Sequence, residues 1–130
     1  MALIVQKYGG TSVADPDRMR AVAEHVAFTR GHGNDVVVVV SAMGKATDNL
    51  IALADSVSSV QPGREMDMLL TTGERVSAAL LTMALAAQGI EAVSFTGSQV
   101  GIVTDTAHRK AKILEVKGDR VRAALAAGKV

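Results

Sequence analysis

The chain has 130 residues, of which 48% are apolar, enough to form the core of one domain. Its 14 basic and 13 acidic residues leave a net charge of +1, which argues against nucleic acid as the main partner and against intrinsic disorder. Aromatic residues make up only 2% and cysteine is absent, which disfavours base-stacking surfaces and excludes disulfides, thiolate catalysis and cysteine metal sites. The three histidines have no metal-ligand spacing, so we expect no metal site in the chain.

The N-terminus shows no targeting segment. Its apolar run is too short for a signal peptide and is not preceded by basic residues. No stretch approaches the roughly 18 continuous apolar residues that a membrane helix needs. We therefore expect a cytoplasmic protein that binds no membrane.

The N-terminal part of the chain predicts a strand–helix–strand unit. Residues 3–7 form a short apolar strand that a Gly-Gly turn closes. Asp15 as N-cap and Pro16 at the first helical position start a helix that Gly31 and Gly33 end. Consecutive valines at 36–40 indicate a strand buried on both faces, as in parallel sheets. This order predicts a βαβ unit with a right-handed crossover.

Two helices are predicted next, over about residues 48–58 and 64–88, separated by a Pro-Gly break. The second helix has an apolar stripe with steps of three and four: Met66, Leu69, Gly73, Val76, Leu80, Met83 and Ala87. Because residues 76–87 contain no charge, we expect this helix to be buried on most sides.

The C-terminal part predicts short strands at 92–95, 101–104 and 112–116, followed by a helix at 119–127. Lys129 and Val130 resemble the first step of another buried strand. The pattern as a whole predicts an α/β fold with a mainly parallel sheet. Since the chain stops within a helix–strand unit, we expect it to be a piece of a longer protein.

The first candidate site is the segment Lys7-Tyr8-Gly9-Gly10-Thr11-Ser12, which follows a strand and precedes a helix. Glycines let backbone N–H groups approach phosphate oxygens, hydroxyls donate further hydrogen bonds, and a lysine neutralises charge. The segment matches neither a Walker loop nor a dinucleotide fingerprint. It predicts a phosphate site, with an ordinary glycine turn and a solvated lysine as the alternative.

The second candidate is the small-residue loop Ser41-Ala42-Met43-Gly44, with Thr47 just beyond it. If the two predicted strands are neighbours, this loop and the glycine turn face one crevice at the carboxyl ends of the strands. The loop would then leave room for a ligand and offer hydroxyl and amide groups to it. A plain turn is the alternative.

The third candidate is Glu74, in Thr72-Gly73-Glu74-Arg75 within the long helix. Its neighbours at helical spacing are apolar, and a buried carboxylate is costly unless it meets a cation or a ligand amine. Gly73 costs ~1 kcal/mol relative to alanine in a helix interior, which suggests close approach by another group. The alternative for Glu74 is an internal ion pair with an arginine or lysine.

Taken together, these motifs resemble the aspartokinases of the amino acid kinase superfamily, and the resemblance runs over essentially the whole chain. Four stretches carry it: Lys7-Tyr8-Gly9-Gly10-Thr11-Ser12-Val13, Val38-Val39-Val40-Ser41-Ala42-Met43-Gly44, Leu70-Thr71-Thr72-Gly73-Glu74-Arg75 and Ser94-Phe95-Thr96-Gly97-Ser98-Gln99. Residues 34–35 and 64–69 look like actinobacterial members in particular.

The resemblance implies a three-layer αβα, carbamate kinase-like fold, cut after its N-terminal half. Residues 1–130 would be an incomplete catalytic domain, without the nucleotide-binding half and the regulatory ACT domains. The implied reaction transfers the γ-phosphoryl group of ATP to the side-chain carboxylate of L-aspartate, giving 4-phospho-L-aspartate, the first step toward lysine, threonine and methionine. We expect the chain by itself to be inactive and the full-length enzyme to be an oligomer.

The resemblance also implies roles for individual residues. Lys7 would be catalytic, stabilising the charge of the transferring phosphoryl group. The residues that would bind the ATP phosphates are Lys7, Tyr8, Gly9, Gly10, Thr11 and Ser12. Ser41 and Thr47 would line the aspartate pocket, and Glu74 would hold the substrate ammonium. Mg²⁺ would bridge the phosphates, with no metal ligand from this chain.

Two departures from the family pattern stand out. Lys45 and Ala46 replace an acid–threonine pair expected in close relatives, which leaves the charge of that loop open. Arg109 follows His108 where relatives often have glycine, so the turn there is expected to differ. Two other functions stay open: another amino acid kinase acting on a small carboxylate, or a non-catalytic remnant that binds a ligand or a partner subunit.

Overall fold

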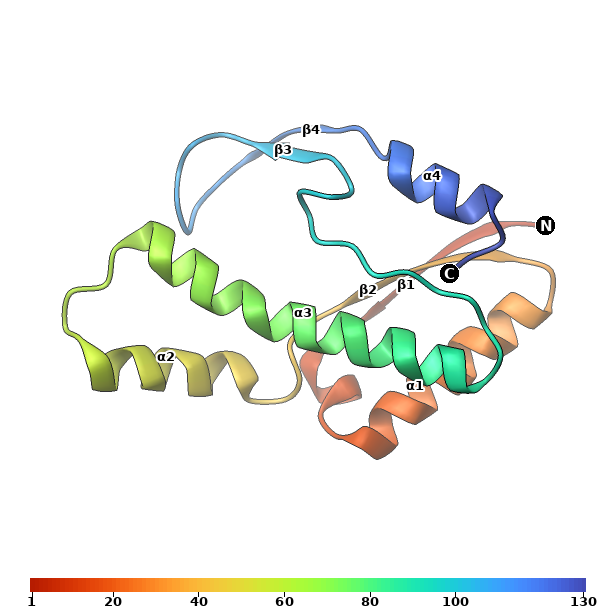
Figure 1. The fold of residues 1–130 in the computed structure, drawn as a ribbon, viewed down its shortest axis with the longest axis horizontal. Helices are drawn as coiled ribbons and strands as arrows, with labels where there is room; N and C mark the ends of the chain where they lie inside the picture. The colour runs from red at the N-terminus through yellow and green to blue at the C-terminus, as the bar shows by residue number, and fades with distance from the viewer.

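A computed structural model describes all 130 residues, and Figure 1 shows their arrangement. The elements in chain order are β1 (Leu3–Tyr8), the 3-10 helix η1 (Gly10–Val13), α1 (Pro16–Gly31), β2 (Asp35–Val40), α2 (Ala46–Val57), α3 (Gly63–Ala87), β3 (Ile102–Thr104), β4 (Ile113–Val116) and α4 (Asp119–Ala126).

The predicted strand–helix–strand unit is confirmed. Strands β1 and β2 pair in parallel, with Leu3 opposite Asp35 at one end and Val40 opposite Tyr8 at the other. The connecting helix α1 begins as the sequence predicts, because the Asp15 carboxylate accepts a hydrogen bond from the Arg18 backbone N–H at 2.8 Å. This unit brings the carboxyl ends of both strands to one edge.

Helices α1 and α3 pack against each other and cover one face of the β1–β2 pair (Figure 1). The core between them is made of eight buried residues: Val13, Met19, Val22, Ala23, Val26, Val36, Leu81 and Leu85. The other face of the pair is open, and Val5 and Val39 are 62% and 47% exposed. The expectation that the valine strand is buried on both faces is therefore wrong for this chain, because both covering helices lie on the same side.

The prediction of which residues of α3 are buried is also wrong for the second half of the helix. The buried positions are Met66, Gly73, Ser77, Leu81 and Leu85, whereas Val76 and Met83 are 51% and 66% exposed. Small residues at 73 and 77 allow close packing, and the four-residue steps that follow run along the contact with α1. Since residues 76–87 carry no charge, the sequence offers no polar face that would mark this orientation.

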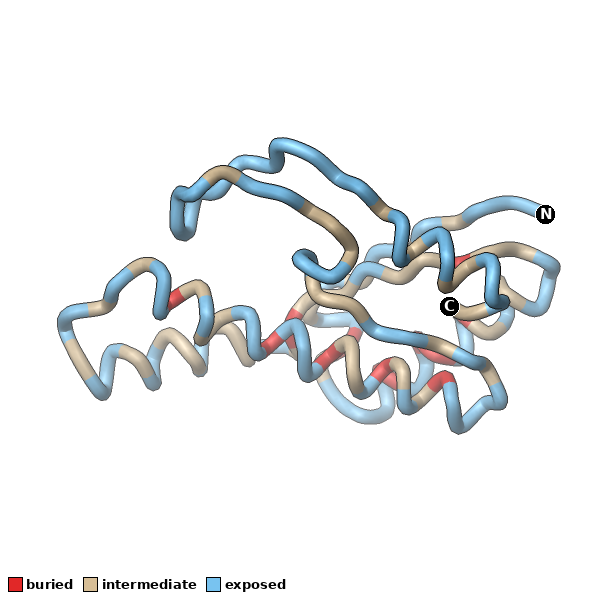
Figure 2. The backbone as a smooth tube through the Cα atoms, turned by 45° about the horizontal axis from the view of Figure 1, so that its top comes forward, coloured by how far each residue is buried: buried red, intermediate tan, exposed pale blue.

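The C-terminal part of the chain is less regular than predicted, and Figure 2 shows that most of it is exposed. Strands β3 and β4 form an antiparallel hairpin, but residues 92–95 form no regular strand. Only Val130 hydrogen-bonds to that segment, through its N–H to the Glu91 carbonyl and its carbonyl to the Val93 N–H, both at 3.0 Å. A single pairing residue does not define a ladder, so the predicted strand is absent here.

Candidate functional site

The glycine turn and the small-residue loop contact each other at the carboxyl ends of β1 and β2. A β-carbon placed on Gly10 would lie only 2.8 Å from the Ala42 carbonyl oxygen, and the Gly44 N–H donates a hydrogen bond to the Gly10 carbonyl at 2.9 Å. No larger residue fits at position 10 without moving the backbone of this loop. The expectation that the two loops are neighbours is confirmed.

The third motif reaches the same place through Gly73 of α3. A β-carbon on Gly73 would lie 2.9 Å from the Ala42 β-carbon and 3.6 Å from Cδ1 of Leu50. A glycine in a helix interior predicted that another group packs closely against Gly73. That group is the loop residue Ala42 of the same chain. Gly10, Ala42 and Gly73 form a junction of three small residues, and each comes from a different motif.

Lys7 and Tyr8 occupy the end of β1 and point to opposite faces of the strand. The Lys7 side chain is exposed on the open face, while Tyr8 packs against the core on the covered face. Successive strand residues always divide in this way, so the motif presents its ammonium and its aromatic ring to different sides of the sheet.

Glu74 is exposed rather than buried, and its carboxylate forms no ion pair or hydrogen bond with another residue of the chain. The prediction that Glu74 is buried is wrong, and so is the alternative that it forms an internal ion pair. The reason is helix geometry: the face of α3 that packs on the core contains Gly73 and Ser77, and Glu74 lies about 100° around the helix from Gly73. Ser41 and Thr47 are half-buried near the junction.

An open hollow of about 390 Å³ lies beside the glycine turn, on the α1 side. Its lining residues are Tyr8, Thr11, Ser12, Arg18, Ala21, Val22 and His25. It thus holds three of the predicted phosphate-binding residues, whereas Lys7, Ser41, Thr47 and Glu74 are not among its lining.

Two basic residues of this hollow, Arg18 and His25, were assigned no role from the sequence. The Arg18 guanidinium donates a hydrogen bond to the Thr11 carbonyl at 2.8 Å, and the His25 ring meets the Tyr8 ring edge-on at 6.4 Å. Their seven-residue spacing puts both on one face of α1, which is the signal that could have found them.

Tyr8 is held at the rim of the hollow by a short chain of hydrogen bonds. Its hydroxyl donates to Oε1 of Gln6 at 3.0 Å, and Nε2 of Gln6 donates to the Thr29 hydroxyl at 2.8 Å. Burial raises the pKa of Tyr8 above its usual value, because the phenolate would lose solvation. The ring is therefore a neutral, fixed wall beside Thr11 and Ser12.

No group of three or more His, Cys, Asp or Glu side chains in the chain could hold a metal ion. No helix has the length and apolar character needed to cross a membrane. The three motifs contribute hydroxyls, backbone amides, the Lys7 ammonium and the Glu74 carboxylate, and the hollow adds Arg18 and His25. These groups suit binding of a charged small molecule.

The family model described as the amino acid kinase family matches residues 2–130. The aspartokinase of Mycolicibacterium smegmatis is 58% identical over 130 residues, and the aspartokinase of Corynebacterium glutamicum is 56% identical. Each match covers 100% of this chain and 31% of the relative. The chain thus spans less than a third of the length of the curated relatives it matches.

The fold of the chain also matches solved structures of aspartate kinases. The aspartate kinase from Synechocystis superposes with a TM-score of 0.84 at 51% identity, covering 98% of this chain and 20% of that one. The E. coli aspartokinase III in complex with aspartate and ADP superposes at 0.80 with 20% identity, covering 100% and 40%, a likeness of fold alone. These matches confirm the predicted α/β fold class. Since the family model spans nearly the whole sequence, the chain belongs to the amino acid kinase family.

Proposed function

We propose that this chain is the phosphate- and aspartate-binding part of an aspartokinase, which transfers the γ-phosphoryl group of ATP to the side-chain carboxylate of L-aspartate. The observation that carries the proposal is the junction of Gly10, Ala42 and Gly73, which gathers three motifs at the carboxyl ends of two parallel strands. The 58% identity to a protein named aspartokinase supports the choice of aspartate as substrate.

In this proposal the glycine turn and Lys7 serve the nucleotide. Gly9 and Gly10 let backbone amides approach the phosphates, and the Thr11 and Ser12 hydroxyls donate hydrogen bonds to them. The exposed Lys7 ammonium neutralises charge on the transferring phosphoryl group. Tyr8 shapes the wall beside the two hydroxyls, as its place in the hollow suggests.

The amino acid substrate is assigned to the other two motifs. Glu74, exposed and without a partner in the chain, binds the substrate ammonium. The Ser41 and Thr47 hydroxyls donate hydrogen bonds to its carboxylates. A carboxylate oxygen of aspartate then attacks the γ-phosphorus, the bond from that phosphorus to the bridging oxygen breaks, and ADP leaves with the electron pair. The attacking oxygen is already ionised, so positioning and charge stabilisation suffice.

Mg²⁺, which kinases of ATP commonly use, is held in such enzymes largely by the nucleotide phosphates, and this chain gathers no group of three or more His, Cys, Asp or Glu side chains. The proposal therefore assigns no Mg²⁺ ligand to residues 1–130. We infer that a complete enzyme supplies its metal contacts elsewhere or through the nucleotide.

The test is a chimera in which this chain replaces the matching 31% of the M. smegmatis aspartokinase. We expect the purified chimera to form ADP from ATP only when L-aspartate is added, with glutamate and N-acetylglutamate as control acceptors. Unmodified M. smegmatis enzyme is assayed in parallel. A folded chimera that phosphorylates another acceptor, or none, would count against the proposal.

A further inference from the structure

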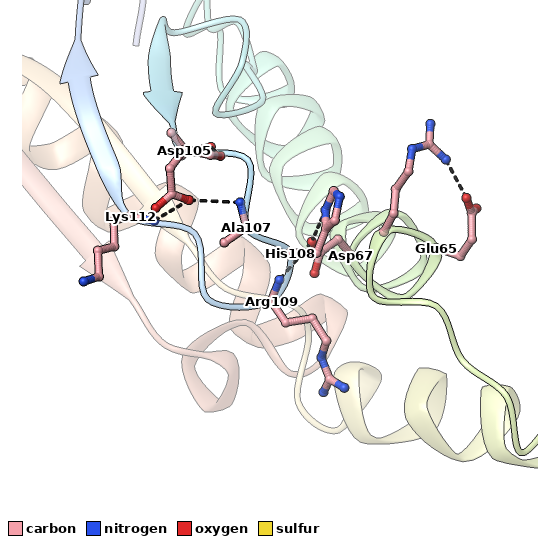
Figure 3. A network of polar contacts seen from close by, with 9 residues as sticks. Glu65, Asp67, Asp105, Ala107, His108, Arg109 and Lys112 are labelled. Carbon is pink, nitrogen blue, oxygen red and sulfur yellow. Dashed lines mark hydrogen bonds and ion pairs between the residues drawn. The ribbon is translucent and has the colours of Figure 1, made fainter.

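The tip of the β3–β4 hairpin is fastened to the first turns of α3 by one carboxylate. Oδ2 of Asp67 accepts a hydrogen bond from the Arg109 backbone N–H at 3.1 Å and lies 3.3 Å from Nδ1 of His108 (Figure 3). No other hydrogen bond joins residues 101–118 to α3. Asp67 is therefore the single polar anchor of the hairpin on this helix.

The loop at the tip has hydrogen bonds of its own, separate from those to Asp67. Oδ1 of Asp105 accepts hydrogen bonds from the Ala107 N–H at 3.1 Å and the Lys112 N–H at 3.3 Å (Figure 3). Arg109 has a φ of 65°, in the left-handed region. Its N–H is not used within the loop and donates to Asp67 instead.

Apolar packing adds little to this attachment. The strand residues Ile113, Leu114 and Val116 are 63%, 68% and 60% exposed, so they are not packed on a neighbouring element. The tip does approach α3 closely at Gly63, where an added β-carbon would lie 3.2 Å from the His108 β-carbon. The position of the hairpin therefore depends mainly on the Asp67 carboxylate and on the space left by Gly63.

Asp67 and Glu74 lie on the same face of α3. Seven residues make almost two helical turns, which separates the two carboxylates by about 10.5 Å along the axis. Figure 1 shows the hairpin running along the N-terminal half of α3, with its tip near the beginning of the helix, where His108 and Arg109 contact Asp67. The anchored tip therefore lies on the side of α3 to which both Asp67 and Glu74 point.

We propose that Asp67 is a positioning residue for aspartate binding: by anchoring the hairpin tip, it holds residues 102–116 as a cover over the side of the site that contains Glu74. This inference rests on the proposed function of Glu74. Asp67 itself touches neither substrate nor nucleotide, and it acts through the Arg109 N–H and the His108 ring. Its removal would free the cover while leaving the phosphate motif in place.

The first test measures amide hydrogen exchange in the 130-residue chain. We expect Asp67→Ala to speed exchange of the Arg109 amide by roughly tenfold or more, since a hydrogen bond to a charged acceptor is lost. Asp67→Asn keeps an acceptor oxygen and should have a smaller effect. Glu65→Gln removes a neighbouring exposed acid that pairs only with Arg64, and should leave the hairpin unchanged. Equal exchange in Asp67→Ala and the parent would overturn the anchor.

The second test uses the chimera. We expect Asp67→Ala to raise the KM for aspartate several-fold while the KM for ATP stays constant and kcat changes little, with Asp67→Asn in between. A general folding defect would not separate the two substrates in this way. A rise in both KM values, or in neither, would contradict the proposal. Inactivity of the parent chimera would count against the proposed function, and the exchange experiment would still decide whether Asp67 anchors the hairpin.

Discussion

Gly73 of α3 packs directly against Ala42 of the small-residue loop. A β-carbon at position 73 would lie only 2.9 Å from the β-carbon of Ala42, so no side chain larger than hydrogen fits there without a shift. This contact joins the long helix to the loop that follows β2. It therefore sets the distance between the Glu74 segment and the glycine turn, because Gly10 contacts the other side of the same loop.

Replacing Gly73 by alanine sets two effects against each other. Alanine gains ~1 kcal/mol in helix propensity, but overpacking against Ala42 costs about 1–3 kcal/mol. We expect Gly73→Ala to lower the free energy of unfolding of the chain by about 1 kcal/mol in urea titrations. Gly31→Ala is the matched control, since a β-carbon there meets nothing within 4 Å and should not destabilise. A Gly73→Ala variant more stable than the parent would show that the contact is loose.

Arg109 holds a backbone conformation that favours glycine, with a φ of 65°. A left-handed conformation costs a residue with a β-carbon roughly 1–2 kcal/mol. We expect Arg109→Gly to raise the free energy of unfolding by about 0.5–1 kcal/mol, after allowing for the greater freedom of glycine in the unfolded chain. Arg109→Ala removes the guanidinium but keeps the β-carbon, so it should give no such gain. Equal stabilities of the two variants would contradict the strain at this turn.

Lys7 tests the assignment of the phosphate site. In the chimera, we expect Lys7→Ala to lower kcat by at least about 100-fold, the usual scale for removing one electrostatic donor from a transition state. Lys117→Ala, which removes an exposed lysine outside both the glycine turn and the hairpin cover, should leave kcat near the parent value. Unchanged turnover in Lys7→Ala would remove Lys7 from its proposed role.

The isolated chain is expected to be inactive. It spans 31% of the M. smegmatis aspartokinase, so most of the length of that enzyme has no counterpart in these 130 residues. ADP formation from ATP and L-aspartate should therefore stay at the level of a sample without protein. Measurable aspartate-dependent turnover by residues 1–130 alone would contradict this expectation.

Tyr8 makes stability depend on pH in the alkaline range. Burial raises its pKa in the folded chain above the usual 10.0, so the folded state keeps the phenolic proton longer than the unfolded state does. The contribution of Tyr8 is fully present below pH 10.0 and is lost as the pH rises through the pKa of the folded state. Because Tyr8 is the only tyrosine, phenolate absorbance reports on it directly, and its midpoint should shift down on unfolding in urea. Identical midpoints in the folded and unfolded chain would contradict the effect of burial.

Local signals in the sequence predicted local structure well. Asp15 and Pro16 mark the start of α1, because an N-cap and a proline at the first turn act within one helical turn. The glycine at position 73 correctly indicated a close approach within α3. In these cases the physics is confined to neighbouring residues or to the backbone itself.

Features that depend on distant packing were predicted less well. The exposed Glu74 and the buried Ser77 reflect which face of α3 meets α1, and a run of uncharged residues cannot specify that face. Residues 92–95 have the composition of a strand, but a strand needs a partner along its length, and only Val130 pairs with this segment. The Asp67 anchor joins residues more than forty positions apart, which no local pattern indicates.

The β1–β2 pair has a consequence for how the chain behaves in solution. In a sheet of two strands, each strand has one side whose amide and carbonyl groups are not paired within the sheet. The open face beside these unpaired strand edges contains Leu3 and Val5, which are both more than half exposed. At rising concentration, molecules of this chain are expected to add strand to strand, so light scattering should grow with concentration and fall when a charge is placed at Val5.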